Sequence, residues 1–282
     1  LFLLMDHFGG FNTFLGCFAY GGVAICPDGR SPQAVCAAIA AGQATLLPTT
    51  PTFLNLLLAS GAWERHDLSS LKLISYGTEI MPEATLRGIR KILPTVDVKQ
   101  TYGLSEAGVL RSKSDGDSVW VQIGGSGFET KIVDGILWVR SESNMLGYLN
   151  AESPFDVEGW FCTGDHIEQR GEYIRFLGRK SEVISVGGQK VFPAEVESVL
   201  LQAGNVVEAT VHATPHPLLG KAIVARVSLG TDEDPAQATL RLREFCKAQL
   251  QKYKVPMRFE IVDADSQHSQ RYKKARPAAT DE

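Results

Sequence analysis

Residues 159–197 read GWFCTGDHIEQRGEYIRFLGRKSEVISVGGQKVFPAEVE and contain the clearest structural pattern in the chain. Alternating runs on either side of Gly171 predict an antiparallel hairpin that ends near Arg179. A short strand and the Gly187-Gly188 turn follow, and Pro193 then occupies a position typical of the first turn of a helix. The stretch therefore predicts a β-meander that leads into a smaller α+β unit.

Asp165 and Arg179 fall at adjacent strand ends in this prediction. A carboxylate accepts two hydroxyl hydrogen bonds, while a guanidinium supplies a planar fork of donors. The pair therefore suits a diol that is flanked by a phosphate. The alternative is a surface salt bridge on an ordinary β-meander, and the spacing alone does not separate the two.

The complete order of motifs resembles the adenylate-forming superfamily, which holds acyl-CoA synthetases, peptide-synthetase adenylation domains and luciferases. The resemblance rests on residues 160–165 (WFCTGD), Gly178-Arg179 and residues 187–197 (GGQKVFPAEVE). It covers the whole chain but only the later part of the family's plan. The family's Gly/Thr/Ser-rich phosphate loop has no counterpart before His7, and the chain begins with Leu1 in mid-pattern. We therefore expect an N-terminally incomplete member.

Composition describes an ordinary globular protein. The chain has 282 residues, which is enough for two domains with hydrophobic cores. Its net charge of −4 does not indicate a nucleic acid or an anionic membrane as a partner. The apolar start is interrupted by polar residues, so we expect no membrane span. Five cysteines without a C-x-x-C pair predict buried free thiols and a cytoplasmic location.

The predicted fold class is α/β, with a mainly parallel sheet and its helices, a small antiparallel β subdomain, and a smaller α+β C-terminal domain. Residues 1–114 alternate strand-like and helix-like segments, with strands expected at 1–5, 23–26, 44–47, 71–75 and 96–101. Short alternating segments fill residues 115–179, which complete the large domain. A mobile C-terminal domain is expected over residues 180–282.

Two glycine-containing loops follow predicted strands, where ligands of parallel sheets bind. Gly77, Thr78 and Glu79 follow the strand predicted at 71–75. The strand predicted at 96–101 is followed by Tyr102, Gly103, Ser105 and Glu106. Taken alone, each could be an ordinary turn. The resemblance implies that the first loop lies against adenine, that Tyr102 packs on adenine, and that Ser105 touches the α-phosphate. It also implies that Glu106 is a catalytic magnesium ligand.

Two further catalytic residues are implied by the resemblance. His7 stands at the family's aromatic-histidine element, where we expect it to orient the substrate; by itself it would more simply be a structural histidine. Lys273 matches the lysine of the family's closing motif, although Tyr272 replaces the glycine there, and a solvated basic tail is the simpler reading of the composition.

The resemblance also implies motion between the domains. Ser181 falls at the pivot, where the family usually has Asp or Lys, and a hinge needs tolerant dihedral angles more than charge. Gly187 and Gly188 lie in the strand pair that the family swings toward the active site. The absence of side chains at these positions would let a pantetheine arm pass.

The expected function is ATP-dependent activation of a small carboxylic acid as an acyl-adenylate, followed by transfer to a thiol. The cofactors are then ATP or AMP, Mg²⁺, and coenzyme A or phosphopantetheine, and an acyl or peptidyl carrier protein is a conceivable partner. Two alternatives stay open. One is a peptide-synthetase-type adenylation unit, and the other is an inactive AMP-binding module without the phosphate loop.

Overall fold

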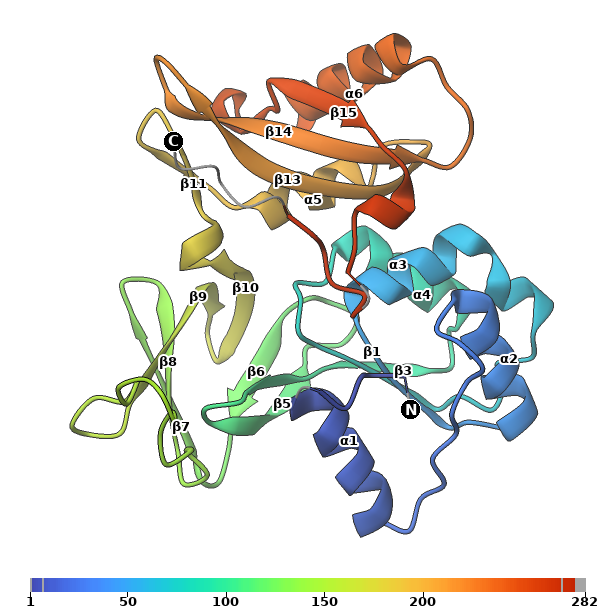
Figure 1. Ribbon diagram of the computed structural model, residues 1–282, viewed down its shortest axis with the longest axis vertical. Coiled ribbons are helices and arrows are strands. Elements are labelled where there is room, and N and C mark those ends of the chain that lie inside the picture. The colour runs from blue at the N-terminus through green and yellow to red at the C-terminus, as the bar shows by residue number, and fades with distance from the viewer. Residues whose placement is uncertain (1, 7, 270, 277–282) are drawn as a thin grey trace.

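The computed structural model describes residues 2–6, 8–269 and 271–276 of the chain. Three sheets organise it (Figure 1). The first is parallel, in the order β1-β2-β3. The second is a seven-stranded sheet in the order β4-β5-β6-β10-β9-β8-β7, and the third has the order β12-β11-β14-β13 with β15 beside β14. The α/β class predicted from the sequence is confirmed.

The parallel sheet consists of β1 (Leu46–Thr49), β2 (Leu73–Tyr76) and β3 (Asp97–Gln100). Its helices are α1 (Phe8–Ala19), α2 (Pro32–Gly42), α3 (Pro51–Ser60) and α4 (Glu83–Ile92), with the short η1 (Ala62–Arg65) after α3. Ser31 and Thr50 cap α2 and α3 by accepting backbone N–H bonds, and a proline follows each cap.

Two predicted strands at the start of the chain are wrong. Residues 2–6 and 23–26 have no regular structure. Phe2 is buried, but its ring packs on Phe53 and its carbonyl accepts a hydrogen bond from the Arg30 side chain. An apolar run predicts burial, and burial here comes from an aromatic cluster rather than from strand pairing.

The antiparallel sheet begins at Tyr102, earlier than the expected start of the β subdomain at residue 115. Its strands are β4 (Tyr102–Leu104), β5 (Gly108–Ser114), β6 (Val121–Gly124), β7 (Phe128–Val133), β8 (Ile136–Ser141), β9 (Phe161–Arg170) and β10 (Tyr173–Arg179). The predicted hairpin around Gly171 is confirmed, because Arg179 pairs with Asp165 across β9 and β10. The division of the chain at 114 and 179 stays a prediction.

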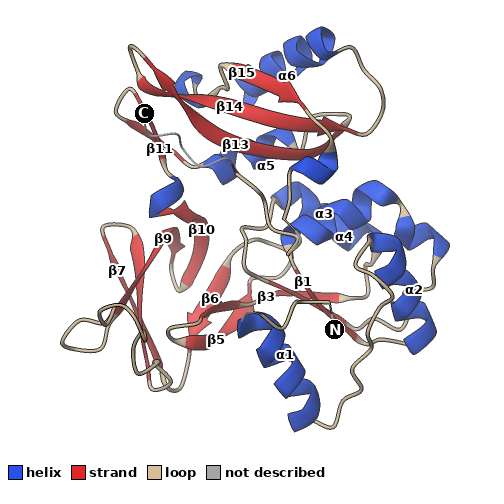
Figure 2. Cartoon of the chain, viewed as in Figure 1, coloured by secondary structure: helices blue, strands red, loops and turns tan. Residues whose placement is uncertain are grey.

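The third sheet follows a single turn, η2 (Lys180–Glu182). It contains β11 (Ile184–Val186), β12 (Gln189–Val191), β13 (Val206–His216), β14 (Gly220–Leu229) and β15 (Arg258–Ile261). The helical elements α5 (Pro193–Leu200), α6 (Pro235–Gln249), η3 (Lys252–Lys254) and η4 (Ala264–Ser266) accompany it. Figure 2 shows this sheet above the other two, with α3 and α4 between it and the parallel sheet.

Residues after β15 return to the parallel-sheet region (Figure 1). Several hydrogen bonds cross the seam between the first lobe (the parallel sheet and its helices) and the C-terminal lobe (the third sheet and the residues that follow it). The Asn55 amide donates to the Val207 carbonyl at 2.5 Å, Thr50 Oγ1 donates to the Tyr272 carbonyl at 2.8 Å, and the Tyr272 hydroxyl donates to the Arg30 carbonyl at 2.6 Å. The last segment therefore ties the third sheet to the helices of the first.

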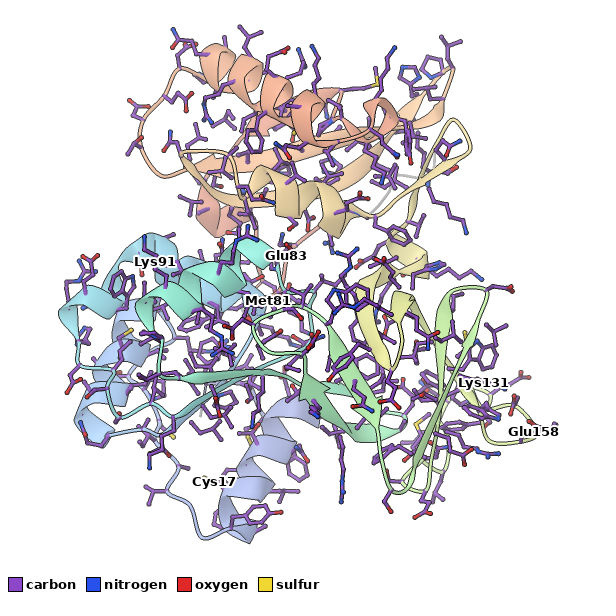
Figure 3. The ribbon with its side chains drawn as sticks, turned by 180° about the vertical axis from the view of Figure 1, so that it is seen from behind. Cys17, Met81, Glu83, Lys91, Lys131 and Glu158 are labelled. Carbon is purple, nitrogen blue, oxygen red and sulfur yellow. The ribbon has the colours of Figure 1, made fainter. Side chains whose placement is uncertain are left out.

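The five cysteines, all within the described ranges, are free thiols. Cys36 and Cys246 are buried as expected, but Cys26 and Cys162 are exposed, so the prediction of burial is wrong for these two. Cys26 lies in the irregular segment and Cys162 points outward from β9, where apolar neighbours in sequence do not imply burial. Cys17 is on α1, at the opposite end of the molecule from the third sheet (Figure 3). Among the described residues, no helix has the length and apolarity to cross a membrane.

Candidate nucleotide site

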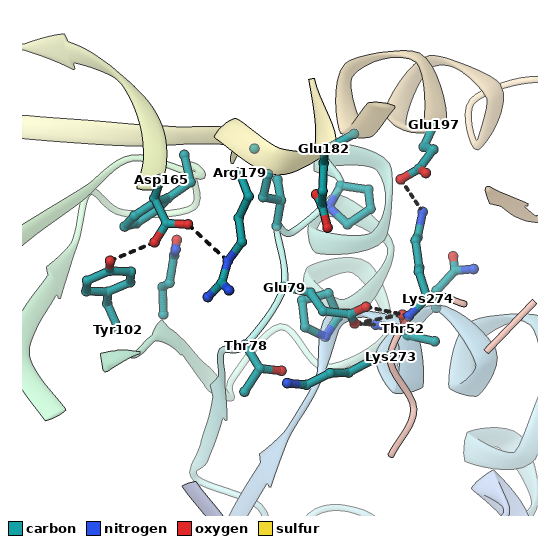
Figure 4. A pocket seen from close by; sticks show the side chains of 18 of the residues that line it. Thr52, Thr78, Glu79, Tyr102, Asp165, Arg179, Glu182, Glu197, Lys273 and Lys274 are labelled. Atoms are coloured by element: carbon teal, nitrogen blue, oxygen red, sulfur yellow. Dashed lines mark hydrogen bonds and ion pairs between the residues drawn. The ribbon is translucent and has the colours of Figure 1, made fainter. Parts of the chain in front are cut away.

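A cavity of about 310 Å³ opens where the three sheets approach one another. Its walls come from the loop after β2, the start of β4, the middle of β9, the end of β10, helix α5, and the last described residues of the chain. The predicted site residues that line it are Thr78, Glu79, Tyr102, Gly103, Asp165, Arg179 and Lys273. Segments that are far apart in the sequence therefore meet in one pocket (Figure 4).

Asp165 and Arg179 face each other on one wall of this cavity. Arg179 Nε lies 3.3 Å from Asp165 Oδ1, and the Arg179 side chain is 61% exposed, against 11% for Asp165. The hairpin register causes the pairing, since the two residues are direct partners. A buried acceptor next to an accessible donor fork can hold neighbouring hydroxyl and phosphate groups of one ligand.

Tyr102 fixes the carboxylate from the other side. Its hydroxyl donates to Asp165 Oδ2 at 2.7 Å, and its ring stacks on Phe176 with centroids 4.7 Å apart. Burial raises the pKa of the tyrosine hydroxyl well above its usual value, and the nearby Asp165 charge raises it further. Burial also raises the pKa of the Asp165 carboxyl, against the lowering effects of Tyr102 and Arg179.

Lys273 enters the cavity from a hairpin, which we call the lysine hairpin (residues 267–275, of which 270 is not described). Ser269 N–H donates to the Lys273 carbonyl at 2.8 Å, and Ala275 N–H donates to the Gln267 carbonyl at 2.8 Å. The lysine side chain points toward Thr78 (Figure 4). Burial lowers the pKa of its ammonium group, and the Glu79 carboxylate opposes that shift.

Tyr272, which stands where the superfamily has glycine, adopts φ 51°, in the left-handed region that favours glycine. The side chain compensates for this conformation by packing against the rings of Phe53 and His268. Its hydroxyl and carbonyl are both bonded to residues outside the hairpin. The tyrosine therefore keeps the backbone shape expected of glycine and adds an anchor.

Several predicted site residues lie outside the cavity lining: Gly77, Ser105, Glu106, Ser181, Gly187 and Gly188. A Cβ at Gly77 would meet Thr101 Oγ1 at 2.7 Å, so glycine is needed there for the contact between two loops. Gly187 and Gly188 have φ of 55° and 82° and form the tight turn between β11 and β12. Ser181 lies in η2. His7 is outside the described residues.

Glu106 could contribute one ligand to magnesium. Its Oε1 accepts a hydrogen bond from the Tyr148 hydroxyl at 2.7 Å. Within the described ranges, no group of three or more His, Cys, Asp or Glu side chains could hold a metal ion. One carboxylate fits magnesium bound together with a nucleotide, since this ion usually takes substrate phosphates and waters as its other ligands.

Sequence reasoning missed the residues that hold the lysine hairpin. Glu197, on α5 and 2% exposed, accepts from Lys274 Nζ at 2.9 Å, from Arg276 Nη2 at 3.0 Å and from Val211 N–H at 2.9 Å. Burial opposes ionisation of Glu197, but the two cations outweigh it and hold the pKa of the carboxyl below its usual value. Pro193, Val196, Glu197 and Leu200 form the buried stripe of α5, so a charged residue at helical spacing within that stripe was the available signal.

Comparison with known proteins identifies the family. Residues 1–149 match the AMP-binding enzyme family, and residues 195–270 match the C-terminal domain of AMP-binding enzymes. The chain belongs to the AMP-binding enzyme family. The predicted membership of the adenylate-forming superfamily is thereby confirmed.

Relatives of this AMP-binding chain are acid–thiol ligases. A 3-(7a-methyl-1,5-dioxo-octahydro-1H-inden-4-yl)propanoyl:CoA ligase of Rhodococcus jostii (strain RHA1) is 31% identical over 267 residues, which are 89% of this chain and 50% of the relative. An indoleacetate–CoA ligase of Aromatoleum aromaticum is 29% identical, over 93% of this chain and 54% of the relative. The chain thus spans about half the length of these relatives.

Solved structures of adenylate-forming enzymes share this fold. The anthranilate CoA ligase AuaEII in complex with anthranoyl-AMP aligns with a TM-score of 0.76 at 27% identity, covering 86% of this chain and 51% of that one. ATP-bound MatB from Rhodopseudomonas palustris aligns with a TM-score of 0.75 at 26% identity, covering 93% of this chain and 55% of that one.

Proposed function

We propose that this chain supplies the nucleotide-binding and lysine-bearing part of an AMP-forming ligase that joins a carboxylic acid to a thiol. One observation carries the proposal: Asp165, Arg179 and Lys273 line the same cavity. An acidic and a basic group suited to a ribose phosphate therefore stand in one pocket with an ammonium group suited to a reacting phosphate.

The first half-reaction joins the acid to AMP. A substrate carboxylate attacks the α-phosphorus of ATP, and pyrophosphate leaves. Negative charge accumulates on the phosphoryl oxygens during this step, and a preorganised cation stabilises it; one such donor is typically worth about 3–4 kcal/mol. Lys273 is the proposed donor, and its partial burial strengthens the interaction. Magnesium bound through Glu106 would neutralise further phosphate charge.

The second half-reaction passes the acyl group to a thiol. We propose that residues 180–282 rotate about Ser181, which withdraws Lys273 and brings the Gly187-Gly188 turn to the cavity. The short connection between β10 and β11 supports a hinge, because it consists of the single turn η2 and Val183. Such a rearrangement can limit turnover.

The thiol has two candidate sources. Most of the relatives named above act on coenzyme A, whereas a medium/long-chain fatty acid–acyl-carrier-protein ligase of Mycobacterium tuberculosis is 28% identical over 89% of this chain. We propose coenzyme A as the acceptor. Turnover that requires a carrier protein and ignores coenzyme A would instead favour a carrier-loading adenylation unit.

AMP binding tests the nucleotide site directly. We expect the chain to bind AMP, and Asp165→Ala to weaken the affinity about 10- to 100-fold, because the ribose hydroxyls lose a charged acceptor. Isothermal titration calorimetry measures both dissociation constants. The control is Glu168→Gln, a change on the exposed part of the same strand that pairs with Arg175 and lies outside the cavity lining. Equal AMP affinity for the wild type and Asp165→Ala would refute the assignment.

The affinity for AMP should also depend on pH. Burial raises the pKa of Asp165, so its carboxyl takes up a proton at a higher pH than an ordinary aspartate does. A protonated carboxyl accepts fewer hydroxyl hydrogen bonds, and we therefore expect AMP affinity to fall as the pH drops through this raised pKa. Titrations from neutral to acidic pH should show the fall in the wild type, and Asp165→Asn should show a flatter profile.

Turnover distinguishes an enzyme from a binding module. A pyrophosphate-exchange screen over fatty, aryl and amino acids should reveal an acid that supports exchange. The screen is run on two samples: this chain, and the longest open reading frame that contains its coding sequence. The second sample is included because the relatives are about twice as long as this chain. Tight AMP binding without exchange for any acid in either sample would favour an inactive AMP-binding module.

A further inference from the structure

The Glu79 carboxylate lies at the seam between the two lobes. Its Oε2 accepts bonds from Thr52 Oγ1 at 2.7 Å and Thr52 N–H at 3.3 Å, at the start of α3. Its Oε1 accepts a bond at 2.7 Å from the backbone N–H of Lys274. One side chain thus joins the first lobe to the residue that follows Lys273 (Figure 4).

Both halves of this bridge are suited to a negative charge. In the first turn of α3 the Thr52 N–H has no acceptor within the helix and donates to Glu79, and the positive end of the helix dipole also favours a carboxylate there. The Lys274 N–H is a backbone donor, so its position reports the path of the chain rather than a flexible side chain. The bridge therefore constrains where the lysine hairpin can run.

The side chains of Lys274 and Arg276 are held by the C-terminal lobe. Glu197, which lies on α5, binds the side chains of Lys274 and Arg276, and Lys274 Nζ also donates to the Ala209 carbonyl at 2.8 Å. These contacts move with the C-terminal residues. The contact between Glu79 and Lys274 instead crosses the seam, and so does the contact between Thr50 and Tyr272.

We infer that Glu79 is a positioning residue for the adenylation half-reaction, because its carboxylate locks the backbone beside Lys273 onto the N-terminus of α3. It acts through the hairpin and touches no reacting atom in this role. The backbone around Glu79 can still border the nucleotide, as the sequence predicts. The inference depends on the proposed function for its kinetic consequence, whereas its structural consequence is independent of it.

Glu79→Gln is the test, since the amide keeps the shape but offers one acceptor where the carboxylate offers two. One of the two sides of the bridge must then face an NH₂ donor instead of an acceptor. We expect amide hydrogen exchange over residues 271–275 to speed up about tenfold or more. We also expect pyrophosphate exchange to fall about 10- to 100-fold, while thioester formation from supplied acyl-adenylate changes less than about threefold.

The matched control is Glu83→Gln, in the first turn of α4. Its carboxylate is half exposed, pairs with Arg87 at 3.4 Å and lies outside the cavity lining. A second variant, Thr52→Val, removes only the hydroxyl donor and should loosen the hairpin less than Glu79→Gln. It keeps the proposal testable if Glu79→Gln fails to fold, which thermal unfolding by circular dichroism would show.

Three outcomes separate the possible errors. If the hairpin amides exchange no faster in Glu79→Gln and Thr52→Val than in the control Glu83→Gln, the bridge is overturned. A looser hairpin with equal losses in both half-reactions would overturn its selective role in adenylation. A looser hairpin in a protein whose wild type supports no exchange for any acid would leave the bridge standing and would refute the proposed function.

Discussion

Lys273→Ala is expected to lower acid-dependent pyrophosphate exchange about 100- to 1,000-fold, because the reacting phosphate loses a preorganised cation in a partly buried pocket. Thioester formation from supplied acyl-adenylate should keep most of its rate, since the lysine is proposed to leave the site before that step. Pyrophosphate-exchange and single-turnover thioester assays measure the two halves separately.

An exposed lysine elsewhere in the C-terminal lobe provides a control for Lys273. Lys252→Ala removes an ammonium group from η3, outside the cavity lining, and should leave both half-reactions close to the wild-type rate. Lys273→Arg keeps the charge and should recover part of the exchange rate. Losses of equal size in the two half-reactions of Lys273→Ala would contradict a lysine that serves adenylation alone.

Glu197→Gln should produce the largest loss of stability. It removes the negative charge shared by two cations whose side chains are 12% and 22% exposed, Lys274 and Arg276. Removing one partner from a buried charge network typically costs about 3–5 kcal/mol. We expect this loss in the C-terminal sheet, where faster hydrogen exchange of α5 and β13 amides, including Val211 N–H, would report it.

Glu195→Gln, two residues away on α5, is the matched control. Its carboxylate is 41% exposed and pairs with Lys254 at 2.6 Å, so its loss should cost no more than about 1 kcal/mol. Similar effects of the two substitutions would show that burial does not distinguish the two glutamates.

At acidic pH the wild type and Glu197→Gln should have similar free energies of unfolding. The folded-state pKa of Glu197 lies below its ordinary value of 4.5, so its charge contributes stability above that value. The contribution disappears as the pH falls through the lowered folded-state pKa. Denaturant titrations from neutral pH to about pH 3 should therefore show the two free energies of unfolding converging.

The sequence predicts the parts of the fold that depend on local pattern. The hairpin around Gly171 forms because alternating residues flank a tight turn, and its register places Asp165 beside Arg179. Helices α2 and α3 begin at a proline directly after Ser31 and Thr50, a local pattern that is typical of a helix start. The apolar run at residues 2–5 was misassigned, because apolar character indicates burial without saying whether a neighbouring strand is available.

The candidate site was predictable only in part. Motif residues such as Tyr102 and Lys273 line the cavity, whereas Glu106 and the Gly187-Gly188 turn are not among its lining residues. The bond between Glu79 and Lys274 spans most of the chain, and no local pattern encodes a partner at such a distance. The burial of Glu197 was readable from helical spacing, but the identity of its partners was not.

The ring of Tyr272 bears on the proposed movement between the two lobes. The ring contacts Phe53 and Phe2, which belong to the first lobe, and it stacks on His268 of its own lobe. Moving a ring from such contacts into water costs roughly 25 cal/mol for each Å² of apolar surface that becomes exposed. If the two lobes separate as the proposed function requires, this ring would have to leave its aromatic contacts, so the cluster would add to the free-energy barrier of that movement.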